Sequence, residues 1–254
     1  MDQAYIPKNR QGFPVGSYVV IRPLETEKPI ESAKKPYFYN INALEPIKLG
    51  IIDEIFKVLD KFIGDYDNII ITGSFLERGF SFNDIDILII KKDYSPADKL
   101  ADILKGSIGI NAHLMFLDNN ALIKGLSMDP LYQMMLNKYV SKKRFLYKIQ
   151  HHIDYKILDI HLLKSNGLID NFDELNGSDK YNLTRNMVAI MLYLKSRHIN
   201  KEYIDSTIKK IFKLKDINEI KQNMLNKNDY LKIYKSIYSK IFNNLMEQIK
   251  NGSK

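Results

Sequence analysis

Residues 69–92 read IIITGSFLERGFSFNDIDILIIKK, two apolar runs joined by a stretch that contains Gly73-Ser74 and a pair of aspartates. Both runs are rich in isoleucine, which favours β-strands, and the first run ends at the Gly-Ser turn. The second run begins with Asp84 and Asp86, although burying an unpaired charge is energetically costly. Something must therefore compensate these carboxylates: a basic side chain, exposure at the end of the strand, or a metal ion.

The two aspartates are expected to lie on one face of the second strand, because side chains alternate between the faces. Leu88 and Ile90 share that face and isoleucines cover the other, so the strand is expected to be covered on both sides, with the carboxylates at the rim of the sheet. Carboxylates and substrate phosphates are usual ligands of Mg²⁺, and the N–H groups of a turn after glycine can bind phosphate. The segment therefore predicts a site for a nucleoside triphosphate (NTP) with Mg²⁺ or Mn²⁺.

The whole sequence predicts an α/β fold of the α+β kind, in three parts. Residues 1–45 are rich in proline and contain one strand-like run at 17–24, so we expect an extended arm. Residues 46–148 are expected to form a small domain with a mixed sheet. Residues 149–254 are expected to form an all-helical domain.

Hydrophobic periodicity gives the expected elements of the last two parts. In the sheet domain these are a helix at 45–62, strands at 68–74, 84–92 and 109–118, and a helix at 95–106 with Ser95 as its N-cap. No convincing strand is expected after about residue 120. Helices are expected near 129–140, 152–165, 179–197, 201–214 and 227–250.

The net charge of +8 is unevenly distributed along the chain. Residues 135–254 contain 23 Lys and Arg against 12 Asp and Glu, whereas the first 134 residues have a net charge of −3. A basic half beside a slightly acidic half suggests a module that binds a polyanion, although lysine-rich helices are also common as plain solvated surface. Lys142, Lys143 and Arg144 form the cluster best suited to contact a polyanion.

The 254-residue chain contains no cysteine, which excludes disulfides and thiolate metal sites and makes a reducing compartment the default. The N-terminal sequence MDQAYIPKNRQG lacks the apolar core of a signal peptide. The longest apolar stretch, MVAIMLYL at 187–194, is far too short to span a bilayer. We therefore expect a soluble, cytoplasmic protein without a membrane partner.

Gly73-Ser74, nine intervening residues and then Asp84-Ile85-Asp86-Ile87 resemble the signature of the DNA polymerase beta-like nucleotidyltransferases. The stretch GSFLERGFSFNDIDILI is similar to the GS-x-x-x-RG…DID form of the minimal and archaeal members, with Arg78 and Gly79 at the familiar places. The similarity covers about residues 46–148.

The resemblance implies that a nucleoside monophosphate is transferred from an NTP, ATP by default, to a hydroxyl of RNA, protein or a small molecule. Gly73 and Ser74 would hold the β- and γ-phosphates, with Arg78 near them. Asp84 and Asp86 would coordinate one or two Mg²⁺ ions. The acceptor would attack the α-phosphate in line, so catalysis would consist of positioning and charge stabilisation.

One part of the family pattern is missing. Active members usually carry a third carboxylate on the next strand, but GINAHLMFLD at 109–118 offers Asn111 and His113 at its centre and Asp118 at its end. His113 could act as the base instead, although a lone histidine in an apolar strand is more often structural. Two functions stay open: an active transferase with an altered base, or a non-catalytic nucleotide- or RNA-binding regulatory protein, antitoxin-like, with a degenerate site.

Overall fold

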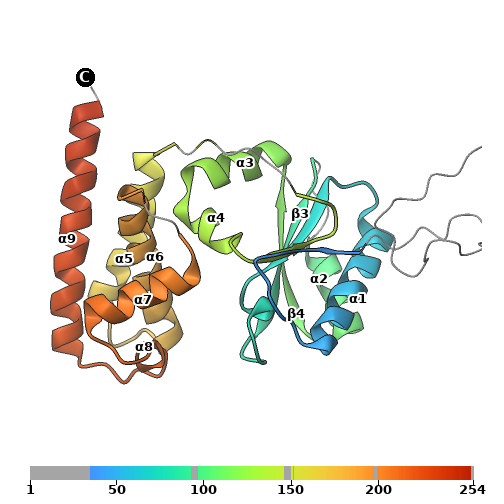
Figure 1. Cartoon of the computed structure of the whole chain (residues 1–254), viewed down its shortest axis with the longest axis horizontal. Helices are drawn as coiled ribbons and strands as arrows, with labels where there is room; N and C mark the ends of the chain where they lie inside the picture. The colour runs from blue at the N-terminus through green and yellow to red at the C-terminus, as the bar shows by residue number, and fades with distance from the viewer. Residues whose placement is uncertain (1–34, 93–96, 146–149, 151, 197–198, 253–254) are drawn as a thin grey trace, which may run out of the picture. The chain divides into compact units, whose positions relative to one another are not determined.

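The first half of the described chain is built around a five-stranded mixed sheet (Figure 1). The computed structural model describes residues 35–92, 97–145, 150, 152–196 and 199–252. The strand order is β1-β5-β2-β3-β4, with β1 at Tyr37–Tyr39, β5 at Tyr139–Ser141, β2 at Asn68–Thr72, β3 at Asp84–Ile90 and β4 at Asn111–Leu117. β3 and β4 are parallel, and the other pairs are antiparallel. Strands and helices together confirm the predicted α+β class.

The centre of the sheet is the antiparallel pair β2 and β3, the two apolar runs of the sequence. Their register places Asn68 opposite Ile90 and Thr72 opposite Asp86. The chain between them contains η1 (Ser74–Leu76), one turn of 3-10 helix. From β3 the chain crosses through α2 (Ala97–Ile108) to the parallel strand β4, as a parallel connection requires.

Both faces of the sheet are covered by helices, which explains why β2 and β3 are apolar on both sides. α1 (Pro46–Ile63) and α2 pack on the face that carries Ile69, Ile71, Ile85, Ile87 and Ile89. α3 (Asn119–Met128) and α4 (Pro130–Met135) pack on the face that carries Ile70, Leu88 and Ile90. The aspartates of β3 belong to the second face, as the alternation predicted.

After β5 the described chain is helical. It contains α5 (Tyr155–Asp170), α6 (Gly177–Leu194), α7 (Lys201–Phe212), α8 (Asn218–Lys221) and α9 (Lys227–Gly252). These helices share a hydrophobic core of their own, in which Tyr230 and Tyr234 of α9 are buried. The Tyr234 hydroxyl donates a hydrogen bond to the Ser165 carbonyl oxygen at 2.8 Å, so its polar atom is satisfied.

The prediction that no strand follows residue 120 is wrong, because β5 forms by pairing with β1 and β2, which its three residues alone do not reveal. The helix expected at 129–140 is confirmed over its first half only, as the short α4. A separate helix, α3, precedes it and begins at a side-chain cap from Asp118. The strand expected at 17–24 and the Ser95 cap lie outside the described residues.

Residues Pro36–Lys254 form one compact unit, which holds both the sheet and the helices after it. The domain limits at 46–148 and 149–254 stay predictions. Among the described helices, none combines the length and the apolar character needed to cross a bilayer.

Candidate functional site

The two aspartates of β3 lie at its accessible end. Asp84 is exposed and Asp86 is half-buried, whereas the alternating Ile85 and Ile87 are fully buried on the other face. In the described part of the chain neither carboxylate forms an ion pair with lysine or arginine, and the ion-pair partner of Asp86 is His113. Within the described residues, therefore, no lysine or arginine is in ion-pair contact with either acid. Two neighbouring carboxylates without such a partner fit a divalent cation.

Gly73 brings the turn after β2 into direct contact with Asp86. Its φ of 86° lies in the region that favours glycine, and a Cβ added there would collide with Oδ2 of Asp86. Thr72 is the register partner of Asp86 across the β2–β3 ladder, which fixes this approach. The following residue, Ser74, is exposed. The predicted phosphate turn and the predicted metal ligand therefore lie side by side.

β4 places Asn111 beside Asp84 and His113 beside Asp86, and it brings no carboxylate to either position. Nδ1 of His113 lies 3.2 Å from Oδ1 of Asp86, and the imidazole is 60% exposed. Asp118 caps α3 by accepting a hydrogen bond from the Ala121 backbone N–H, so it has a structural role away from the pair. Beside Asp86, β4 therefore presents an accessible histidine and no acid.

A buried lysine holds the turn that follows Ser74. Lys48 of α1 is fully buried, and its ammonium donates hydrogen bonds to the carbonyl oxygens of Glu77 at 2.5 Å and Gly79 at 2.6 Å. It also forms an ion pair with Glu45 at 3.0 Å. The Gly79 N–H donates to Glu45, and this bond together with Lys48 lowers the pKa of Glu45 to about 2. We call Glu45 and Lys48 the turn clamp.

Three phenylalanines surround the turn clamp. The Lys48 ammonium lies 5.4 to 5.7 Å from the ring centres of Phe75, Phe80 and Phe82. Cation–π attraction of this kind helps to stabilise a lysine that is removed from water. This role could not be predicted from the sequence, because Lys48 lies near the start of an amphipathic helix, where a lysine is normally exposed to solvent.

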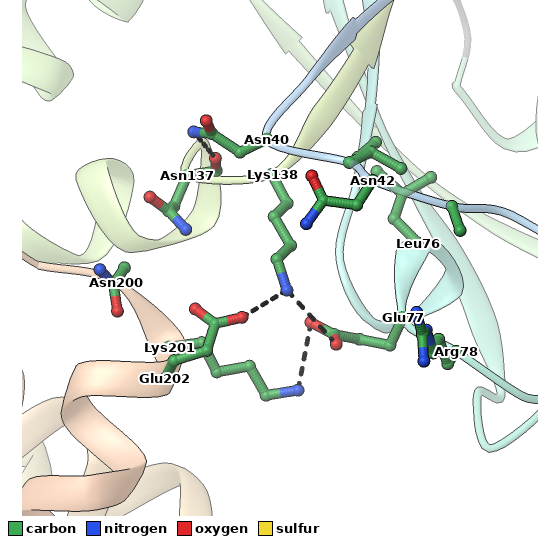
Figure 2. Close-up of a pocket in the computed structure, with 12 residues that line it drawn as sticks. Asn40, Asn42, Leu76, Glu77, Arg78, Asn137, Lys138, Asn200, Lys201 and Glu202 are labelled. Carbon is green, nitrogen blue, oxygen red and sulfur yellow. Dashed lines mark hydrogen bonds and ion pairs between the residues drawn. The ribbon is translucent and has the colours of Figure 1, made fainter.

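Glu77 forms ion pairs with two lysines and not with the neighbouring Arg78. Glu77 forms ion pairs with Lys138 at 3.7 Å and with Lys201 at 3.2 Å, and Lys138 also pairs with Glu202 at 2.5 Å (Figure 2). This four-residue network joins the turn and the residue before β5 to α7. Arg78 is exposed and forms no ion pair within the described residues.

The helical part adds Arg185 of α6 to the site, a residue that the sequence analysis missed. Burial lowers the pKa of its guanidinium, while the negative charges of Asp205 and Asp86 act in the opposite direction. Nε of Arg185 is buried without a hydrogen-bond partner among the described residues. A partly buried cation near Asp86, with a donor that has no partner among the described residues, suits an anionic ligand atom. Its position just before the apolar run at 187–194 was the only sequence signal.

Tyr181 lies one helical turn before Arg185 on α6 and is buried. Its hydroxyl donates a hydrogen bond to Asp205 at 2.8 Å, and burial raises the pKa of both groups. The Lys221 ammonium stacks over the Tyr181 ring at 4.6 Å from its centre. The helical part therefore contributes one cation near Asp86, Arg185, and beside it a buried tyrosine that pairs with Asp205.

The Lys142–Arg144 cluster lies at the opposite end of β2 from Gly73. The Lys142 backbone N–H bonds the Ile69 carbonyl oxygen, and Lys142 pairs with Asp60 of α1. The Lys143 ammonium donates to the Tyr66 carbonyl oxygen at 2.5 Å. Lys143 and Arg144 are both exposed, and neither forms an ion pair within the described residues. The structure does not bring this cluster to the acids, and its contact with a polyanion stays a prediction.

No group of three or more His, Asp or Glu side chains in the described residues could by itself hold a metal ion. Asp84 and Asp86 would therefore supply two side-chain ligands, and a nucleotide phosphate and water would complete the shell, as is usual for Mg²⁺.

Comparison with protein-family models, with curated proteins and with solved structures gave no match to this chain.

Proposed function

We propose that the protein is a Mg²⁺-dependent nucleotidyltransferase, which moves a nucleoside monophosphate from an NTP to a hydroxyl acceptor on RNA or protein. Residues 46–148 would be its nucleotidyltransferase domain, with a helical domain after it. The observation that carries the proposal is the contact between Asp86 and Gly73, next to Asp84, with no lysine or arginine ion pair to either acid among the described residues. Metal ligands and a phosphate-binding turn are needed in this proximity for NTP chemistry.

The side chains present account for each requirement of the reaction. The N–H groups after Gly73 and the Ser74 hydroxyl would hold the β- and γ-phosphates, and Arg185 would donate to a phosphate oxygen. Asp84 and Asp86 would hold Mg²⁺, which when bound neutralises phosphate charge. The acceptor oxygen attacks the α-phosphorus, the bond to the β-phosphate oxygen breaks, and pyrophosphate leaves. With Nδ1 of His113 toward Asp86, Nε2 would accept the acceptor's proton.

Incubation with α-labelled ATP, GTP, CTP or UTP, Mg²⁺ or Mn²⁺, and total RNA or lysate protein tests the proposal. We expect label on a macromolecule, and we expect it to disappear with Asp84→Ala and with Asp86→Ala. Asp102→Ala, which changes an exposed acid on α2, serves as the control and should retain transfer. Transfer that survives both site substitutions would refute the assignment.

One observation favours a second function, a non-catalytic nucleotide-binding protein. β4 presents Asn111 and His113 beside the acids, so no carboxylate is available there as general base. A binder would show a Mg²⁺-dependent thermal shift with NTP, lost in Asp86→Asn, and no transfer with any acceptor pool.

Arg185→Met is expected to weaken NTP binding by about 10- to 100-fold, because a charge-assisted hydrogen bond contributes about 1.5–3 kcal/mol. The unfolding temperature should stay the same or rise, since the substitution removes a buried donor without a partner. Isothermal titration and a thermal melt measure the two effects, and Arg185→Lys should recover part of the affinity. A large drop in stability with unchanged affinity would show that Arg185 is structural instead.

Gly73→Ala is expected to weaken NTP binding at least about 10-fold, because the new Cβ displaces the Asp86 carboxylate. Placing alanine at positive φ also costs about 1–2 kcal/mol of stability. Gly64→Ala is the matched control, since Gly64 has φ 68° and open space around its Cβ position. Both variants should lose similar stability in urea unfolding, and only Gly73→Ala should lose affinity. Equal affinity in the two would contradict the contact argument.

A further inference from the structure

A cavity of about 840 Å³ lies beside the turn after Ser74, bounded by the turn, the two residues before β5, the N-terminus of α7 and the segment before α1 (Figure 2). Sites for small ligands are commonly about 300–1,000 Å³, so the space accommodates one nucleotide unit. The transfer reaction proposed above assigns nothing to this cavity.

Two asparagine amides on the cavity wall are unused. The side chains of Asn42 and Asn137 form no hydrogen bond within the described residues, and Figure 2 shows them on either side of Lys138. By contrast, Asn40 donates to the Asn137 carbonyl oxygen at 2.7 Å, and Asn200 caps α7. An amide offers a donor and an acceptor in one plane, which matches the paired groups on the edge of a nucleobase.

The cavity also has the charge and the apolar walls that a nucleotide needs. Lys138, Lys201 and Arg78 outnumber the acids Glu77 and Glu202, so the lining is positive overall. Arg78 has no ion-pair partner in the described chain and remains available for a phosphate. Ile41 and Leu76 add apolar surface that can contact the faces of a planar ring.

We propose that this cavity binds one nucleotide unit, with Asn42 and Asn137 recognising the base and Arg78 the phosphate. The inference rests on the proposed function for its choice of ligand class. The unit is supplied either by the NTP itself or by an end of an RNA acceptor, because both present the same base, ribose and phosphate. None of the three recognising residues is a metal ligand, so binding here does not require Mg²⁺.

Isothermal titration of the full chain in EDTA with AMP, GMP, CMP, UMP and ribose 5-phosphate tests this. We expect at least one mononucleotide to bind at least 10-fold more tightly than ribose 5-phosphate. The double variant Asn42→Ala/Asn137→Ala should bind all four mononucleotides with the same affinity. Arg78→Ala should weaken the binding of mononucleotides at least 5-fold and leave the binding of the free nucleoside unchanged. Asn243→Ala, an exposed asparagine on α9, is the matched control and should behave as the wild type.

Asp86→Asn separates this proposal from the proposed function. Mononucleotide binding in EDTA that persists in Asp86→Asn places the ligand in the cavity, even if no transfer activity is ever found. If short RNAs bind more tightly than the mononucleotide that matches their terminal base, the nucleotide unit in the cavity comes from the RNA acceptor. If NTPs compete with the same affinity as the mononucleotide, the unit comes from the NTP donor.

The cavity assignment is overturned by any of three results. These are the absence of mononucleotide binding above ribose 5-phosphate, an unchanged base preference in the double asparagine variant, and binding that disappears in Asp86→Asn.

Discussion

Asp86→Asn should reduce nucleotide transfer by about 10³-fold and remove Mg²⁺-dependent NTP binding. Loss of one preorganised group that stabilises developing charge costs about 10²–10³ in rate, and a metal ligand also sets the position of the phosphates. Asparagine keeps the size of the side chain and can still contact His113 at its 3.2 Å position, so the fold should be intact. Removing one of two nearby like charges should leave stability unchanged or slightly higher.

Single-turnover transfer with α-labelled NTP and a urea unfolding curve measure the two parts of this prediction. Asp102→Asn is the matched control, because Asp102 is exposed on α2 and distant in sequence from β3. Unchanged NTP affinity in Asp86→Asn would count decisively against a metal at this position. Loss of the folded state would instead show that the Asp86 carboxylate has a structural role.

Lys48→Met should lower the free energy of unfolding by about 3 kcal/mol. The substitution leaves the Glu77 and Gly79 carbonyl oxygens without their donor and removes the partner of Glu45. Methionine has a similar length and fits among the phenylalanine rings, so the loss comes from the polar contacts. Transfer should also fall, because the same turn carries Ser74.

Lys57→Met provides the comparison on the same helix. Lys57 is 75% exposed and its ion pair with Glu54 is long, at 3.9 Å, so its substitution should change stability by less than about 0.5 kcal/mol. Urea unfolding of both variants is the measurement. Similar losses in the two would mean that the turn clamp contributes little, and that the turn keeps its shape through its backbone alone.

Alternation and apolar runs were enough to predict the part of the fold that carries the acids. β2, β3 and β4 are each long enough for their own residues to identify a strand, and the two-residue period placed Asp84 and Asp86 on one face. β5 could not be predicted, because three residues become a strand only through pairing with β1 and β2. β5 forms through tertiary contacts, so no local sequence pattern predicts it.

The candidate site could be predicted only where its residues share one segment. One segment contains Gly73, Ser74 and the two aspartates, so the pairing of β2 with β3 is enough to bring these residues close together. Arg185 comes from α6, about a hundred residues later, and only packing of the helices brings it near Asp86. Lys48 shows the reverse case, since a lysine in an amphipathic helix is normally exposed, and here it is fully buried.

The proposed activity requires a divalent cation held jointly by Asp84 and Asp86 beside the turn at Gly73. The direct test is the dissociation constant of a non-hydrolysable NTP analogue, measured with saturating Mg²⁺ and in EDTA for the wild type, Asp84→Asn and Asp86→Asn. We predict that Mg²⁺ tightens binding at least 10-fold in the wild type and less than 2-fold in either variant. An equal effect of Mg²⁺ in all three proteins would contradict the account.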